Sequence, residues 1–189
     1  EAEIRRAGLP AQSERWLQRA SLLLLAGDVE GYRTLCRRMN TEAAGISDDH
    51  RSALARVLSF APNDARPPAE VAAMAYETVN AHPTIAWYRY AWGLAAIRAG
   101  QDDLAAARFN EALTTDPNWN GRVLCWLGLA LTDAKRGLVD EGCQRLAMAE
   151  RWLEETGRDA NAQTMAYPPK VADVDWIEAN LLAREAREV

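Results

Sequence analysis

Lysine and histidine are scarce in this 189-residue chain, which contains only Lys135, Lys170, His50 and His82. Its formal net charge is −5, and almost all of its positive charge comes from arginine. Surfaces that bind nucleic acid or anionic lipid need a clustered excess of basic side chains. We therefore expect no nucleic-acid partner. The preference for arginine, together with the many alanines, indicates a bacterial source.

Cysteine is also infrequent, and no long apolar run is present. Cys36, Cys125 and Cys143 have no CxxC spacing, which argues against a disulfide framework or a zinc site and favours a reducing compartment. We expect each of them to be a small core residue. The longest apolar run, Leu22 to Ala26, is far shorter than the roughly 18 residues of a membrane span. The first fifteen residues are too charged for a secretory signal, so we expect a cytoplasmic protein without membrane insertion.

Residue patterns that would indicate catalysis or metal binding are missing. The chain has no HExxH, GxSxG, GxGxxG, P-loop or EF-hand pattern. Asp48, Asp49 and His50 are adjacent, and neighbouring residues in the first turn of a helix point in different directions. The helix dipole explains acidic residues at such a position. We expect no catalytic residue, no metal site and no cofactor, and therefore no enzyme.

Helical periodicity dominates what is present, and alternating strand patterns are nearly absent. Glycine and proline breakers divide the chain into segments of ordinary helix length. Helices are predicted at 13–26, 29–41, 48–60, 68–81, 85–99, 102–115, 121–136, 139–155 and 173–187, with a possible short turn within 1–7 and a long loop over 156–170. Tight turns between consecutive helices predict antiparallel hairpins.

Several predicted helices begin with residues that favour N-terminal caps. Ser47 or Asp48 is suited to cap the third helix, and Asp102 the sixth. For the last helix the candidates are Asp173 and Asp175, and Asp175 has the spacing of a capping box with Glu178.

A repeat emerges from the prolines. Pro83 and Pro117 are 34 residues apart, and each follows a predicted helix and precedes a tryptophan-containing one. Two helices in a 34-residue period are typical of tetratricopeptide repeats. The segment 86–117 resembles that family in its pattern of small, aromatic and turn residues. The matching positions are Trp92, Gly93, Gly100, Ala105, Phe109, Ala112 and Pro117.

Three other segments resemble the family more loosely. The resemblance implies one all-α domain over 1–189, a tetratricopeptide-like α-solenoid of about four helix hairpins. The expected repeats are 13–41, 48–83, 86–117 and 123–155, followed by a capping helix at 173–187. Neighbouring repeats in such an array bury their apolar faces against one another.

The amino-acid sequences of some segments resemble a narrower group, the C-terminal repeat region of large bacterial serine/threonine protein kinases and related WD40-containing proteins. The segments are 22–36, 86–100 and 175–186. The chain has no glycine-rich phosphate loop, HRD or DFG motif. Because it also begins at Glu1 without methionine, we expect a non-catalytic appendage of a longer signalling protein.

In the register of the tetratricopeptide family, certain positions of each first helix face a concave groove. Here they form a largely apolar set: Trp87, Tyr90, Leu94, Ile97, Arg98, Leu124, Leu127, Leu131 and Lys135. Family members that clamp a peptide carboxylate place polar residues where Tyr90 and Leu94 stand, so that mode is disfavoured. The resemblance instead implies an apolar peptide or amphipathic helix as partner. The chain's own helix 173–187, with Val174, Ile177, Leu181 and Leu182, could occupy the groove instead of capping the last repeat.

Three functions remain open from the sequence. The first is a protein-binding or scaffold module within a larger protein. The second is a spacer or homodimerisation element without a separate ligand. The third is an enzyme or small-molecule receptor whose site follows no pattern recognised above.

Overall fold

The computed structural model describes residues 13–43, 47–162 and 172–189. Within these ranges the chain forms nine α-helices and no β-strand, so the protein is all-α, as the periodicity predicted. The helices are α1 (Ser13–Leu25), α2 (Val29–Glu42), α3 (Asp48–Leu58), α4 (Pro68–Ala81), α5 (Ala86–Arg98), α6 (Asp102–Thr115), α7 (Arg122–Lys135), α8 (Val139–Ala162) and α9 (Asp173–Ala186). The turn expected within 1–7 lies outside the described residues.

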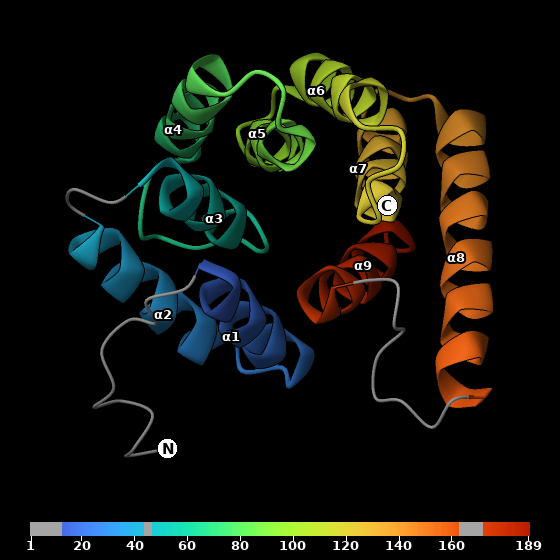
Figure 1. Ribbon diagram of the computed structural model, residues 1–189, viewed down its shortest axis with the longest axis horizontal. Coiled ribbons are helices and arrows are strands. Elements are labelled where there is room, and N and C mark those ends of the chain that lie inside the picture. The colour runs from blue at the N-terminus through green and yellow to red at the C-terminus, as the bar shows by residue number, and fades with distance from the viewer. Residues whose placement is uncertain (1–12, 44–46, 163–171) are drawn as a thin grey trace.

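The helices follow one another as pairs arranged along an arc (Figure 1). The odd-numbered helices α1, α3, α5 and α7 contact each other in sequence along the inner side, while α2, α4, α6 and α8 lie outside them. Each predicted repeat range covers most of one of these pairs, and α8 runs past the predicted end at 155. The packing is consistent with the predicted array of four hairpins.

Helix α9 closes the arc. It contacts α7 and α8 of the last pair and also α1 of the first pair, so that the two ends of the array meet on it (Figure 1). Helix α3 lies at the centre of the first half, in contact with α1, α2, α4 and α5. Every side chain of α3 from Ser52 to Leu58 is buried in consequence.

Three of the hairpins turn in the same way. Gly27, Gly100 and Gly137 follow α1, α5 and α7 with φ of 74°, 70° and 78°. In each case the amide of the next residue donates to a carbonyl five residues earlier, as Gln101 does to Ala96 at 2.9 Å. This is the Schellman end of a helix, and its left-handed residue favours glycine. The α3–α4 connection uses a longer, proline-containing loop instead.

The ring of Phe109 on α6 fixes the approach of two inner helices. It is fully buried, and it lies against Gly93 of α5 and Gly128 of α7. A Cβ atom added at Gly93 would come within 2.6 Å of this ring, and one added at Gly128 within 2.5 Å. The sequence pattern correctly marked Gly93 and Phe109 as packing residues, and Gly128 is the matching residue that it missed.

Some local predictions were wrong. Helix α8 continues to Ala162 through the first half of the predicted loop 156–170, whose remaining residues lie outside the described ranges. Cys36 and Cys125 are buried as expected, but Cys143 is exposed on α8. Ser47 caps α3 as predicted, whereas α6 begins after Gln101 without a side-chain cap, and Asp102 lies in its first turn.

The close contact at Gly93 gives a stability prediction. Gly93→Leu should lower the free energy of unfolding by about 1–3 kcal/mol or more, because the added side chain has to displace the buried ring of Phe109. Ala107→Leu, on the exposed face of α6, is the matched control and should change it by less than about 0.5 kcal/mol. Urea denaturation followed by circular dichroism measures the unfolding free energy of both variants. Equal midpoints for Gly93→Leu and wild type would contradict the close packing of α5 on α6.

Candidate functional site

The residues predicted to line a partner groove do not form an open groove in this structure. Six of the nine, on α5 and α7, are at most 1% exposed: Tyr90, Leu94, Ile97, Leu124, Leu127 and Leu131. Helix α9 occupies the inner side of the arc and packs against α7. The chain's own C-terminal helix therefore lies where the sequence led us to expect a helical partner.

The other three predicted groove residues lie apart from one another. Trp87 is half-buried at the start of α5 and lines a pocket. Arg98 is half-buried at the opposite end of α5. Lys135 is exposed at the end of α7. The structure thus does not bring these three together into one surface.

Helix α9 packs on the hairpins through a stripe of its own apolar side chains. Val174, Ile177, Leu182 and Ala183 are buried, and Leu181 is half-buried. Their spacing is that of one face of a helix, which is why the sequence predicted an amphipathic helix here. The ring of Trp176 packs against Trp152 of α8, with 6.5 Å between ring centroids.

A buried polar cluster crosses the inside of the arc. Arg56 of α3 donates from Nε to Oε2 of Glu178 at 2.7 Å and from Nη2 to Oδ1 of Asp175. The hydroxyl of Tyr90, on α5, donates to the other carboxylate oxygen of Glu178. The Arg56 guanidinium also lies over the Tyr90 ring, 5.1 Å from its centroid. Three helices that are far apart in sequence are joined by these bonds.

Burial dominates the electrostatics of this cluster. Arg56 is 3% exposed, and Glu178 is 1% exposed. Removal from water raises the pKa of the Glu178 carboxyl above its ordinary value, and the positive charge of Arg56 opposes that rise. The pKa of the Tyr90 hydroxyl is raised well above its ordinary value for the same reason, so Tyr90 is a hydrogen-bond donor at neutral pH.

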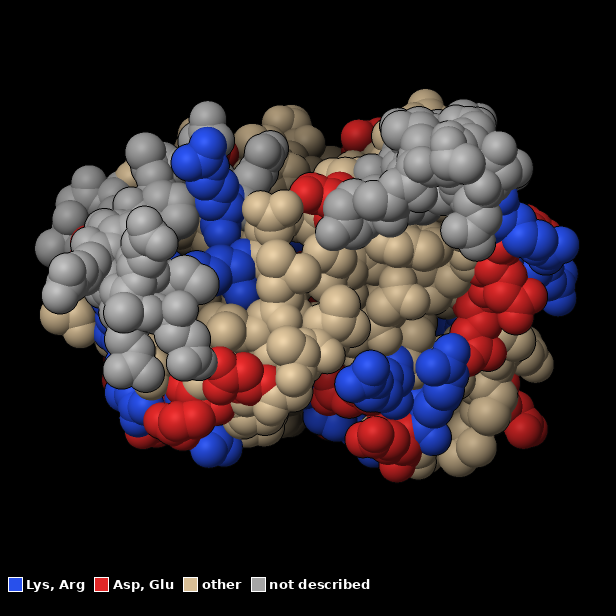
Figure 2. Space-filling model, turned by 90° about the horizontal axis from the view of Figure 1, so that it is seen from below, with Lys and Arg blue, Asp and Glu red and all other residues tan. Residues whose placement is uncertain are grey.

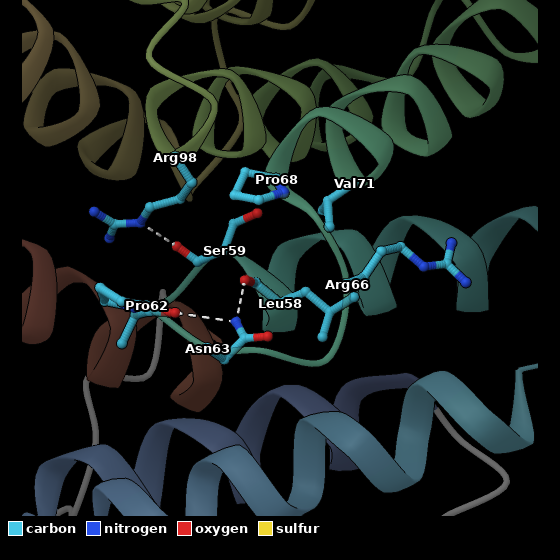
Figure 3. A pocket seen from close by; sticks show the side chains of 9 residues that line it. Leu58, Ser59, Pro62, Asn63, Arg66, Pro68, Val71 and Arg98 are labelled. Atoms are coloured by element: carbon cyan, nitrogen blue, oxygen red, sulfur yellow. Dashed lines mark hydrogen bonds between the residues drawn. The ribbon is translucent and has the colours of Figure 1, made fainter.

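A second arginine holds the other end of α9. Arg98 donates to both carboxylate oxygens of Glu185, and its Nε and Nη2 also donate to the carbonyls of Ser59 at 2.7 Å and Phe60 at 2.9 Å. Figure 3 shows Arg98 beside the small pocket of about 130 Å³ between α3, α4 and their connecting loop. Because Arg98 donates both to the loop carbonyls and to Glu185, it fixes the loop and α9 to each other.

The polar cluster was not predicted from the sequence. Asp175 and Glu178 were interpreted as a capping box, but α9 begins after Ala172 without a side-chain cap and both carboxylates bind Arg56 instead. Two signals could have found it. The carboxylates are three residues apart and share the apolar stripe of α9, and Arg56 stands within the otherwise apolar run of α3.

The open part of this region is a pocket of about 400 Å³ at one end of the ring. Residues from α1, α3, α5, the α6–α7 connection and the start of α9 line it. They are Leu17, Asp49, Ala53, Arg56, Trp87, Trp119, Ala172, Val174 and Asp175. The buried Arg56–Asp175 pair therefore borders a cavity with two tryptophans. We call this cavity the ring pocket.

Neither metal sites nor membrane spans are found in the described part of the chain. Among residues 13–43, 47–162 and 172–189, no three His, Cys, Asp or Glu side chains are grouped so that they could hold a metal ion. In the same ranges, no helix combines the length and the hydropathy that crossing a lipid bilayer requires. No protein-family model matches the sequence, and comparison with curated proteins gives no match.

Removing the arginine tests the importance of the buried cluster. Arg56→Met should lower the free energy of unfolding by about 3–5 kcal/mol at pH 7, because two buried carboxylates lose their counter-charge. The variant Arg56→Met/Asp175→Asn/Glu178→Met should recover much of this loss, since a buried ion pair and an apolar replacement often differ little in stability. Urea unfolding compares the two variants; a triple variant no more stable than the single one would contradict this account.

The raised pKa of Glu178 predicts a pH dependence. Between the ordinary glutamate pKa of 4.5 and the raised value in the folded protein, the folded state binds more protons at this site than the unfolded state. The stability of the wild type relative to Glu178→Gln should therefore be greatest below pH 4.5 and fall as the pH rises through that window. Unfolding free energies of both proteins at matched pH values measure the difference, and a difference that grows with pH would show that Arg56 outweighs burial.

Proposed function

We propose that this domain is a non-catalytic protein-binding module of the tetratricopeptide type, carried as an appendage by a larger bacterial signalling protein in the cytoplasm. The observation that carries the proposal is the seat of α9. An array of helix hairpins holds an amphipathic helix along its inner side by an apolar stripe and specific polar contacts. This arrangement resembles the helix-in-groove mode of protein recognition, here within one chain.

Helix α9 is an integral part of the module and does not give way to a partner. To take its place, a partner helix would have to replace the bonds that Arg56 and Arg98 make to α9 as well as its buried apolar face. Breaking one buried ion pair alone costs about 3–5 kcal/mol, which is a large part of the stability of a typical domain. A partner therefore binds surfaces that α9 leaves open.

The ring pocket is the concave surface that α9 leaves open. Trp87 and Trp119 are each half-buried there, which leaves part of both rings in contact with solvent. Tryptophan is enriched at the centres of protein interfaces, where a large ring contributes contact area with a small loss of conformational entropy. We propose this pocket, with Trp87 as its central residue, as the main contact for a partner.

A second candidate function follows from an exposed apolar surface. Leu22 and Leu25 at the end of α1 are 43% and 45% exposed, and Val29 at the start of α2 is 42% exposed. Figure 2, which views the molecule from below, shows a central band of surface without charged side chains, between the atoms drawn in grey. Apolar surfaces of this kind occur where copies of a chain associate. Homodimerisation is therefore the alternative to a separate partner.

Photo-crosslinking in the cells that express the protein tests these alternatives. A photoreactive phenylalanine analogue placed at Trp87 should give a discrete adduct with another protein. The same analogue at Tyr76, an aromatic residue on the outer helix α4 that is 50% exposed, is the matched control and should give none. An adduct from Tyr76 alone would move the binding surface to the outer side.

Two further outcomes contradict the proposal. Adducts that contain only copies of this chain, most readily from a probe at Leu25, would favour homodimerisation. Discrete adducts from no position would favour a spacer without a ligand. Sedimentation velocity of the purified chain, at several concentrations, measures self-association independently of the crosslinks.

A further inference from the structure

The ring pocket has a distinct chemistry: aromatic walls and carboxylate groups. Trp87 and Trp119 lie on its sides, and Asp49 and Asp175 supply carboxylates. Aromatic faces combined with nearby negative charge are the usual receptor for ammonium and guanidinium groups, because the ring quadrupole and the carboxylate both attract a cation. This combination distinguishes the pocket from the rest of the inner surface, which is closed by apolar packing.

The walls are held in place by the fold. A Cβ atom added at Gly121 would lie 2.4 Å from the Trp119 ring, so the glycine allows this indole to lie against the backbone. The Trp119 ring also packs on Tyr90 in a tilted arrangement, with 5.9 Å between ring centroids. Trp87 packs edge-to-face on Tyr88 at 4.2 Å. Both rings are therefore positioned before any ligand arrives, which lowers the entropic cost of binding.

Among the described residues, the hydrogen bonds to Asp175 and Asp49 each use one carboxylate oxygen. Asp175 is 7% exposed, and only its Oδ1 bonds to Arg56. Its Oδ2 has no hydrogen-bond donor among the described residues, and the position of a Cβ at Gly121 would be 3.0 Å from it. Asp49 accepts from the hydroxyl of Tyr88 through Oδ1, which orients that carboxylate. A side chain at Gly121 would thus crowd Oδ2 of Asp175 at the pocket.

The charge of Arg56 does not make the pocket basic. This guanidinium bonds to Asp175 and to Glu178, so two carboxylates face one positive charge. With Asp49 included, the groups at the pocket sum to a negative charge whether or not Glu178 carries a proton. The positive ends of α3 and α9 also lie here, and each first turn carries one further aspartate, Asp48 or Asp173.

We propose that the ring pocket binds an organic cation, a guanidinium or alkylammonium group, placed between Trp87 and Trp119 and paired with Asp49 and Asp175. The inference rests on the proposed function in one respect: the expected source is an arginine or lysine side chain of the protein partner. A free quaternary amine presents the same chemistry and is the other possible source.

Titration of the full chain with matched small probes tests the proposal. Indole N–H resonances, assigned with Trp87→Phe and Trp119→Phe, report on the pocket. N-acetylarginine methylamide should shift the resonances of Trp87 and Trp119 saturably, with a roughly millimolar dissociation constant. N-acetylcitrulline methylamide, its uncharged isostere, should not. Ionic strength is held constant with sodium chloride, since salt screens charge pairs.

Two variants connect the shifts to the proposed groups. Asp49→Asn should weaken binding of the arginine probe about threefold to fivefold, while its amide oxygen can still accept from Tyr88. Asp140→Asn, at an exposed aspartate in the first turn of α8, is the control and should leave the affinity unchanged. Trp87→Leu, which keeps apolar volume without the aromatic face, should also weaken binding about threefold to fivefold.

The remaining probes separate the source and the failure modes. An arginine-containing peptide that binds more tightly than the single-residue probe supports a protein source, and tighter binding of tetramethylammonium supports a free amine. Equal binding of the citrulline probe, or binding of N-acetylglutamate in place of arginine, would overturn the inference. Crosslinks at Trp87 without any binding of the cationic probes would overturn the cation proposal and leave the protein-binding function standing. Binding of the cationic probes without crosslinks at Trp87 would contradict the protein source alone.

Discussion

The bond between Arg56 and the two carboxylates of α9 is the constraint on which the rest of this structure depends. An array of helix hairpins has two open ends and an open inner side, because each pair buries its faces only against its neighbours. Here one helix joins the two ends and covers part of the inner side. Helix α9 packs on the last pair and on the first, and Glu178 joins α3 and α5 through Arg56 and Tyr90. The arc becomes a ring with a charged group at its centre.

A charged centre brings specificity at an energetic cost. Moving an arginine and two acids out of water carries a penalty that an apolar centre would avoid, and mutual attraction repays it only with good geometry. In this cluster Arg56 bonds to Glu178 through Nε and to Asp175 through Nη2. An apolar stripe alone would permit α9 to slide by one turn. Arg56 allows one register, because only this alignment brings Asp175 and Glu178 to the same guanidinium.

The sequence predicted the elements of the fold well, for a physical reason. Helix boundaries depend on local signals such as Gly100 and Pro117, and the close packing of Gly93 on Phe109 follows a spacing within one hairpin. The partner of Arg56 is more than a hundred residues away, and no local rule connects them. The same carboxylates had a sufficient local explanation as a capping box, so only Arg56, within an otherwise apolar run, was left to indicate the long-range contact.

The candidate site was likewise only partly predictable from the sequence. The register of the repeats predicted a groove that includes Tyr90, Leu94 and Leu127; these side chains are buried, and what covers the inner side of the array depends on where α9 docks. Once α9 is in place, the surface left open also depends on residues outside the repeat pattern. Trp119 belongs to a connection between hairpins, and Asp175 belongs to α9. The ring pocket therefore combines residues that no single repeat contains, and it exists only while the ring is closed.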